Sequence, residues 1–207
     1  MKVYLVRHGE SESNKGIHTG KETVLTDIGV EQAKRMGIYF HNKKIDIIYC
    51  SQLIRAKDTL KEIKPYLGKI KIKYTKLINE WSRGIYQNIE REKLIEAAKK
   101  SGIEFHHYRP PDGENIADVK KRVEKFYSSL KKNHSNDNIL AVGHGLFFRI
   151  LIMHMMDIHV GEIKYFDLNN AGISYFDIDD SYKVNDFEVD DVKNLIKYSS
   201  YERKKWR

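Results

Sequence analysis

Two histidines follow two short apolar runs of this chain. Arg7 and His8 come directly after the run at residues 3–6, and His144 follows the run at residues 139–142. A short apolar run bounded by glycine predicts a buried strand, and open α/β sheets bind ligands at the carboxyl ends of their strands. A neutral imidazole can attack phosphorus, and an arginine offers planar donors for phosphate oxygens. If the two strands are parallel neighbours, both histidines face one crevice suited to phosphate chemistry.

Two further residues come after other predicted strands. Arg55 lies near the start of a helix that follows the strand at 45–50, and helix N-termini favour anions. Glu80 follows an alternating strand at 70–74, and a carboxylic acid can protonate a leaving alkoxide if its pKa is raised. Each residue alone is typical of an ordinary surface, but beside the two histidines we expect both to serve one phosphate site.

Strand-like and helix-like segments alternate along the chain. Besides the strands above, the pattern predicts a hairpin at 173–178 and 182–189, and helices at 26–40, 51–65, 90–100, 118–132 and 145–156. Thr26 and Ser51 are expected to cap the first two helices, because hydroxyl side chains accept from free helix N–H groups. This alternation predicts an α/β fold, a three-layer α/β/α sandwich with a mainly parallel central sheet.

Length and composition favour a single domain. The chain has 207 residues, of which 41% are apolar, enough to bury one substantial core. We expect one domain over 1–207, with a cap-like insertion at about 81–115 and a basic tail at about 190–207. The one cysteine, Cys50, ends an apolar run and is expected to be a buried hydrophobe. The sequence shows neither a signal-peptide pattern nor a membrane-length apolar run, so we expect a cytoplasmic protein.

The net charge of +8, from 37 basic and 29 acidic residues, raises the question of nucleic-acid binding. Most lysines are scattered along predicted helices. Lys69, Lys71 and Lys73 alternate on an expected edge strand, where lysines guard against aggregation, and a basic run ends the chain at 203–207. We therefore expect a solvated surface without nucleic-acid or membrane partners, and a small phosphorylated metabolite as ligand. The sequence does not indicate an oligomeric state.

The motifs, taken in order, resemble those of the histidine phosphatase superfamily, which includes cofactor-dependent phosphoglycerate mutases, fructose-2,6-bisphosphatases and α-ribazole phosphatases. The resemblance covers nearly the whole chain and implies the phosphoglycerate mutase-like fold. It rests on Arg7-His8-Gly9-Glu10-Ser11 with Asn14, on Leu25, Thr26, Gly29, Gln32 and Ala33, on Ser51, Leu53, Arg55, Ala56 and Thr59, on Leu77, Glu80 and Gly84, on Pro111, Gly113, Glu114, Arg122 and Val123, on Gly143-His144-Gly145 with Arg149, and on Asn170, Ile173, Asn185 and Asp186.

The resemblance also implies roles for single residues. His8 is the expected nucleophile, which becomes a phosphohistidine, and Glu80 is the expected acid for the leaving group and then the base for water. The catalytic residues that it implies are His8, Glu80, His144, Arg7 and Arg55. The substrate-binding residues that it implies are Arg7, Asn14, Thr19, Gly20, Arg55, Arg83, His144 and Gly145. No metal and no cofactor is expected, because neither His106-His107 nor His154 with His159 has convincing ligand spacing.

Two departures from the family favour hydrolysis over mutase activity. Phosphoglycerate mutases carry a Glu-Arg-His-Tyr-Gly stretch where this chain has Glu80-Trp81-Ser82-Arg83-Gly84, and the long mutase insertion before His144 is missing. We therefore expect a metal-independent phosphatase of small phosphomonoesters. A cofactor-dependent phosphoglycerate mutase is the alternative, and a catalytically inactive binding module on the same fold is a further one. Segments 79–88 and 105–114 are expected to choose the substrate through Trp81, Arg83, Tyr86 and Tyr108.

Overall fold

A computed structural model describes residues 1–15, 23–159 and 167–188 of the chain. These residues form a six-stranded sheet in the order β3-β2-β4-β1-β5-β6. The strands are β1 (Lys2–Arg7), β2 (Ile47–Ser51), β3 (Lys71–Thr75), β4 (Asn138–Gly143), β5 (Ile173–Ile178) and β6 (Val184–Glu188). The first four are parallel to one another, and β5 and β6 add an antiparallel edge. The predicted α/β fold with a mainly parallel sheet is therefore confirmed.

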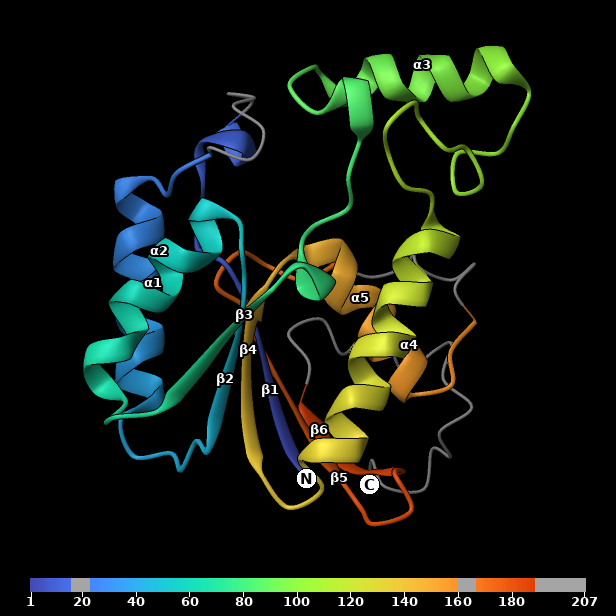
Figure 1. Ribbon diagram of the computed structural model, residues 1–207. Helices are drawn as coiled ribbons and strands as arrows, with labels where there is room; N and C mark the ends of the chain where they lie inside the picture. Colours follow the sequence, from blue (N-terminus) through green and yellow to red (C-terminus); the bar gives the residue numbers. More distant parts are fainter. Residues whose placement is uncertain (16–22, 160–166, 189–207) are drawn as a thin grey trace, which may run out of the picture.

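Helices cover both faces of the sheet. They are α1 (Asp27–Phe40), α2 (Ile54–Ile63), α3 (Arg91–Ser101), α4 (Ile116–Asn133) and α5 (Gly145–Met155). Helices α1 and α2 lie on one face, and α4 and α5 lie on the other (Figure 1). Short 3-10 turns occur at Glu12–Lys15, Lys64–Tyr66, Lys76–Ile78 and Gly84–Tyr86. Among the described residues, none of these helices combines the length and apolar character that crossing a membrane requires.

The core consists of two apolar clusters, one on each side of the sheet. Alternate residues of the same strand enter different clusters: Val3 and Leu5 pack towards α4 and α5, whereas Val6 packs towards α1 and α2. This alternation follows from the period of two in a strand, and both faces are apolar because the parallel strands are covered on both sides. Cys50 is fully buried, as expected, and burial raises the pKa of its thiol to about 12.

The two helix caps predicted from the sequence, Thr26 and Ser51, differ in outcome. Thr26 caps α1, because its hydroxyl accepts from the Gly29 N–H at 3.1 Å. The expected cap at Ser51 is wrong: this residue is the last of β2, and α2 begins at Ile54 with Leu53 as its N-cap. The Ser51 hydroxyl is instead held by hydrogen bonds to residues of other elements. At this position, hydrogen bonds to other elements therefore override the preference of serine for capping a helix.

The segment between β3 and α4 lies beyond the carboxyl ends of the parallel strands (Figure 1). Its two ends are joined by backbone hydrogen bonds, from the Ile85 N–H to the Pro111 carbonyl and from the Glu114 N–H to the Ser82 carbonyl. Gly84 has φ +56, and a side chain there would collide with the Pro111 carbonyl oxygen. The cap-like insertion at 81–115 stays a prediction as a unit, and the basic tail at 190–207 lies outside the described residues.

Candidate active site

Four parallel strands bring the predicted site residues to one edge of the sheet. Arg7 ends β1 and His8 follows it, while His144 follows β4 and is the N-cap of α5. Because β1 and β4 are parallel neighbours, the two imidazoles lie side by side, with ring centroids 5.2 Å apart. Arg55 reaches the same place from the first turn of α2, and Glu80 from the loop after β3. The expected crevice therefore exists.

His8 is a buried imidazole with a defined orientation. Its Nδ1 lies 2.7 Å from the Gly9 carbonyl oxygen, which can only accept, so Nδ1 carries the proton. The Nε of Arg55 donates to Nε2 of His8 at 3.1 Å, so Nε2 presents its lone pair. Burial, the positive charge of Arg55 and then that of Arg7 hold the pKa of His8 well below its ordinary value. His8 is therefore neutral, and its nucleophilic nitrogen faces the Arg55 guanidinium.

The two arginines are fixed by the fold. Arg55 is only 6% exposed, and burial lowers the pKa of its guanidinium while Glu80 opposes the shift. Arg7 donates from a terminal nitrogen to the Leu168 carbonyl, and a side-chain carbon at Gly145 would lie 3.3 Å from Arg7 Nε. Within the described parts of the chain, Nε of Arg7 is buried and has no hydrogen-bond partner. Two fixed cations and spare donor capacity are what a phosphate dianion requires.

His144 is fully buried, and its Nε2 lies 2.7 Å from the Ser51 hydroxyl oxygen. Burial and the charge of Arg55 hold its pKa well below the ordinary value. Its other ring nitrogen, Nδ1, is buried and has no partner among the described residues. A buried polar atom without a hydrogen-bond partner is rare in folded proteins.

The Glu80 carboxylate points at backbone donors. Its Oε1 accepts from the Trp81 N–H at 2.9 Å, and its Oε2 accepts from the Leu146 N–H at 3.4 Å, in the first turn of α5. The second contact joins the loop after β3 to the helix that begins at His144. Glu80 thus lines the same cavity as His8 and both arginines.

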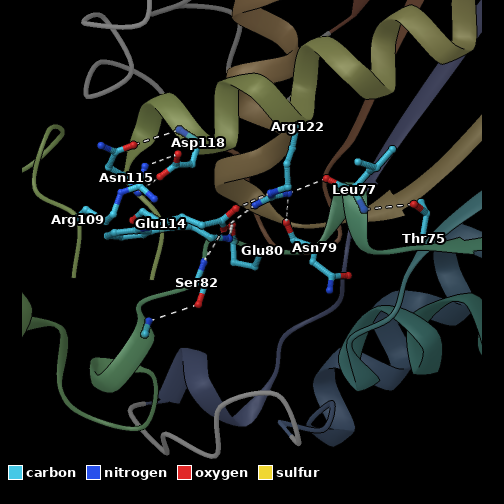
Figure 2. A network of polar contacts seen from close by, with 12 residues as sticks. Thr75, Leu77, Asn79, Glu80, Ser82, Arg109, Glu114, Asn115, Asp118 and Arg122 are labelled. Atoms are coloured by element: carbon cyan, nitrogen blue, oxygen red, sulfur yellow. Dashed lines mark hydrogen bonds and ion pairs between the residues drawn. The ribbon is translucent and has the colours of Figure 1, made fainter. Parts of the chain in front are cut away.

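An ion pair from α4 fixes the loop that carries Glu80 (Figure 2). Arg122 donates to the carbonyl oxygens of Leu77 and Asn79, at 2.6 and 3.0 Å. The same guanidinium makes two hydrogen bonds to the Glu114 carboxylate, at 2.7 and 2.9 Å. That carboxylate also accepts from the Ser82 N–H at 3.0 Å, on the far side of Glu80. The backbone is therefore held on both sides of this side chain.

A cavity of about 650 Å³ opens over these residues. Of the predicted substrate-binding residues, Arg7, Asn14, Arg55, Arg83 and Gly145 line it, together with the catalytic candidates His8 and Glu80. His144 is not among the lining residues, and its ring centroid lies 5.2 Å from that of His8. Thr19 and Gly20 lie outside the described residues. Tyr86 and Tyr108 do not line the cavity and hydrogen-bond with each other instead.

Sequence reasoning assigned no role to several lining residues. Arg149 and Asp167 line the cavity and form an ion pair at 3.6 Å. Arg149 belongs to the same sequence motif as Gly143-His144-Gly145, and its place one helical turn after Gly145 explains why it reaches the same cavity. Arg83 faces the cavity, but its guanidinium donates to the carbonyls of Gln87 and Ile89. Within the described residues, no group of three or more His, Cys, Asp or Glu side chains is arranged to hold a metal.

Known proteins resemble this chain over most of its length. Phosphoserine phosphatase 1 of Hydrogenobacter thermophilus is 28% identical, over 89% of this chain and 90% of that protein. A 6-phosphofructo-2-kinase/fructose-2,6-bisphosphatase of Caenorhabditis elegans is also 28% identical, and the match covers 80% of this chain but only 36% of that protein. Adenosylcobalamin/α-ribazole phosphatases and a phosphoglycerate mutase are further relatives.

The fold has a close counterpart among solved structures. The α-ribazole phosphatase from Shigella flexneri superposes with a TM-score of 0.80, over 91% of this chain and 95% of that one, at 24% identity. The family model of the histidine phosphatase superfamily (branch 1) matches residues 3–189, which include the strands and helices described above apart from the first residue of β1, Lys2. By this match, the chain belongs to the histidine phosphatase superfamily.

Proposed function

We propose that this protein is a phosphoric monoester hydrolase that cleaves small phosphomonoesters without a metal, through a phosphohistidine on His8. The observation that carries the proposal is the state of His8: a neutral imidazole whose Nε2 lone pair lies beside the Arg55 guanidinium. When a phosphoryl oxygen takes over the Arg55 N–H, this lone pair becomes free to attack the phosphorus atom that the same guanidinium holds.

In the first step, the phosphoryl oxygens bind Arg7 and Arg55, with His144 and Asn14 as further contacts. Nε2 of His8 attacks phosphorus, the new N–P bond forms, and the P–O bond to the leaving group breaks. Protonated Glu80 gives its proton to the departing alkoxide. The two guanidinium groups stabilise the charge on the phosphoryl oxygens, which is the main task of a site for phosphoryl transfer.

In the second step, the Glu80 carboxylate takes a proton from water. That water attacks phosphorus, the N–P bond breaks, and phosphate leaves with His8 restored to its neutral form. The Glu80 carboxylate is held beside the start of α5 by its contact with the Leu146 N–H, which keeps it near the strand ends in both steps. One carboxyl group can thus serve both half-reactions.

The substrate is a small phosphorylated metabolite, and the segment at 81–115 supplies contacts beyond the phosphate. Trp81, Phe105 and His106 from this segment line the cavity, and Trp81 and Phe105 form an edge-to-face pair. Arg149 of α5 adds a cation to the lining. This combination of aromatic side chains and an additional arginine favours substrates that carry a second anionic group next to an apolar surface. We place the protein in the cytoplasm on the sequence alone.

Phosphoglycerate mutase activity is the second candidate, because a mutase is among the relatives. A mutase must protect the phosphoenzyme from water, and a cavity of about 650 Å³ that is open to solvent favours hydrolysis. Incubation with 3-phosphoglycerate and the bisphosphorylated cofactor measures this activity directly. An inactive binding module is the third candidate, and turnover of any phosphomonoester rules it out.

The proposal is tested by turnover of an aryl phosphate with and without a chelator. Wild-type protein should release phosphate equally in both conditions, and His8→Ala should lose about 10³-fold or more of kcat, because it removes the covalent nucleophile. His41→Ala, at a histidine after the end of α1, is the matched control and should keep its activity. Inactive wild-type protein, or undiminished turnover by the His8 variant, would overturn the proposal.

A further inference from the structure

A chain of hydrogen bonds links His144 to the loop before Glu80. Nε2 of His144 lies 2.7 Å from the Ser51 hydroxyl oxygen, which lies 2.8 Å from Oδ1 of Asn79. Two backbone N–H groups also take part: Gln52 donates to Oδ1 of Asn79 at 3.0 Å, and Leu53 donates to the Ser51 hydroxyl oxygen at 3.2 Å. All five residues lie at the carboxyl ends of β2 and β4 or in the loop after β3.

The backbone donors determine where each proton in this chain lies. A backbone N–H can only donate, so the Asn79 atom that faces Gln52 is the carbonyl oxygen, which can only accept. The single hydrogen of the Ser51 hydroxyl must then go to Asn79, because neither of the two oxygens could otherwise approach the other so closely. The Ser51 oxygen is left as an acceptor, so Nε2 of His144 is the nitrogen that carries the hydrogen.

This assignment leaves Nδ1 of His144 with a bare lone pair. Nδ1 is buried and has no partner among the residues that the structure describes. Burial of the ring, the charges of Arg55, Arg7 and Arg122 and the neighbouring His8 imidazole all disfavour its protonation. A fully ionised phosphate oxygen and a bare nitrogen lone pair repel each other. The site as it stands therefore lacks one proton when a phosphate dianion occupies it.

We propose that Ser51 and Asn79 are positioning residues that hold His144 as the Nε2–H tautomer, so that the site binds a phosphoryl group together with one proton shared with Nδ1. The inference rests on the proposed function in assuming that the phosphoryl group lies against His144. The bound species is a singly protonated phosphate whose O–H donates to Nδ1, or the equivalent dianion with the proton transferred to Nδ1. The two descriptions contain the same atoms and the same charge.

The source of that proton depends on pH. Below the second pKa of the phosphate, near 6, the ligand brings the proton itself. Above it, the dianion binds and a proton is taken from the buffer. The bond to phosphorus is unaffected, and Glu80 keeps its separate role as the proton donor to the leaving group. Ser51 and Asn79 thereby select the protonation state of the substrate without touching it.

The tautomer is tested by NMR on unliganded protein with ¹⁵N-labelled histidine, near pH 8, where the imidazole is neutral. His144→Gln identifies the His144 signals by their loss. In wild type we expect a protonated Nε2 and an unprotonated Nδ1. Asn79→Asp keeps an acceptor for both Ser51 and Gln52 and should keep this tautomer. Asn79→Ala frees the Ser51 hydroxyl to donate to Nε2 and should populate the Nδ1–H form. A protonated Nδ1 in wild type would overturn the inference whether or not the protein is an enzyme.

The consequence for binding is tested by calorimetry with phenylphosphonate, whose dianion carries no O–H group and whose C–P bond is not hydrolysed, near pH 8, in buffers of different ionisation enthalpy. Glu80→Gln serves as the background, because it removes the proton uptake of that carboxyl group. We expect Asn79→Ala in this background to take up about one proton fewer per bound phosphonate than the background alone. Equal uptake in the two proteins would overturn the inference. Absence of phosphonate binding in both would instead count against the proposed function, and the NMR result would still decide the tautomer.

Discussion

Nε of Arg55 donates a hydrogen bond to Nε2 of His8 at 3.1 Å, across elements 47 positions apart in the chain. The contact has two consequences for phosphate chemistry. It keeps a positive charge beside the imidazole, which contributes to the lowered pKa of His8, and it places a guanidinium next to the position of the reacting phosphorus. The nucleophile and the cation that stabilises its product are therefore adjacent before any ligand binds.

Replacement of Arg55 by lysine should reduce kcat/KM by about 10²-fold or more, because an ammonium group cannot reproduce the planar fork of donors. Steady-state kinetics with an aryl phosphate measures the loss. Arg35→Lys is the matched control, since the Arg35 side chain is 77% exposed and pairs with its helical neighbour Glu31. Equal kinetics for the two variants would contradict the role of the Arg55 fork.

Stability should fall below pH 6.5 because two buried imidazoles stay neutral in the fold. The pKa values of His8 and His144 lie well below 6.5, so the unfolded chain binds more protons than the native one as the pH drops. Their contribution is fully present above pH 6.5 and is lost as the pH falls towards the folded-state pKa values. Each histidine adds at most about 1.4 kcal/mol per pH unit to the slope of the unfolding free energy.

Denaturant unfolding between pH 7 and pH 5 checks this expectation. His8→Gln should reduce the pH dependence of the unfolding free energy by the part that His8 contributes. His41→Gln, at an exposed residue, should leave this dependence unchanged. An unchanged slope in the His8 variant would show that this imidazole is not held neutral in the fold.

The ion pair of Arg122 and Glu114 should matter for both folding and catalysis, because it holds the backbone on both sides of Glu80. Arg122→Met leaves the Glu114 carboxylate without its partner and should cost about 3 kcal/mol of unfolding free energy. The same variant should lower kcat more than it changes KM, since the carboxyl group of Glu80 would lose its fixed position.

Denaturant unfolding and steady-state kinetics together test this pair. Arg109→Met breaks a second Arg–carboxylate pair, with Asp118, in which the arginine is 57% exposed. This control variant should lose less than about 1 kcal/mol of unfolding free energy and keep its kcat. Similar losses in both variants would refute a special role for Arg122.

Substrate choice should depend on Arg149 more than on Arg83. Arg149 lines the cavity beside Asp167, whereas the guanidinium of Arg83 is bound by carbonyl groups of its own segment. Arg149→Met should raise KM about tenfold or more for phosphomonoesters that carry a carboxylate, and should change KM little for phenyl phosphate. A panel of substrates that differ only in the second charged group measures this ratio, and a uniform loss across the panel would exclude charge recognition.

The parts of the fold that follow from local pattern were predictable. The apolar runs before His8 and His144 each predicted a buried strand, and the structure pairs these two strands in parallel. The hydroxyl of Thr26 predicted the start of α1. Strand order and site geometry follow from these elements once the strands pair, because the carboxyl ends of parallel strands meet at one edge.

The parts that depend on tertiary contacts were not predictable. Ser51 has a side chain that often caps a helix, yet its hydroxyl is hydrogen-bonded to His144 and Asn79, which are distant in sequence. Arg83 and Arg149 are the same residue type, and only the folded structure shows that carbonyl groups hold the first guanidinium. The contacts of these side chains depend on residues that are distant in sequence, and a single sequence does not place those residues in space.

Covalent catalysis by His8 is tested most directly by trapping of the phosphoenzyme. Glu80→Gln protein, in which attack by water is slowed, is mixed with an activated aryl phosphate and quenched in alkaline denaturant, where a histidine P–N bond survives. Peptide mass spectrometry should find one phosphoryl group, on the peptide that contains His8, and His8→Ala in the same background should carry none. Turnover without any labelled protein, or a phosphoryl group at another residue, would contradict the account.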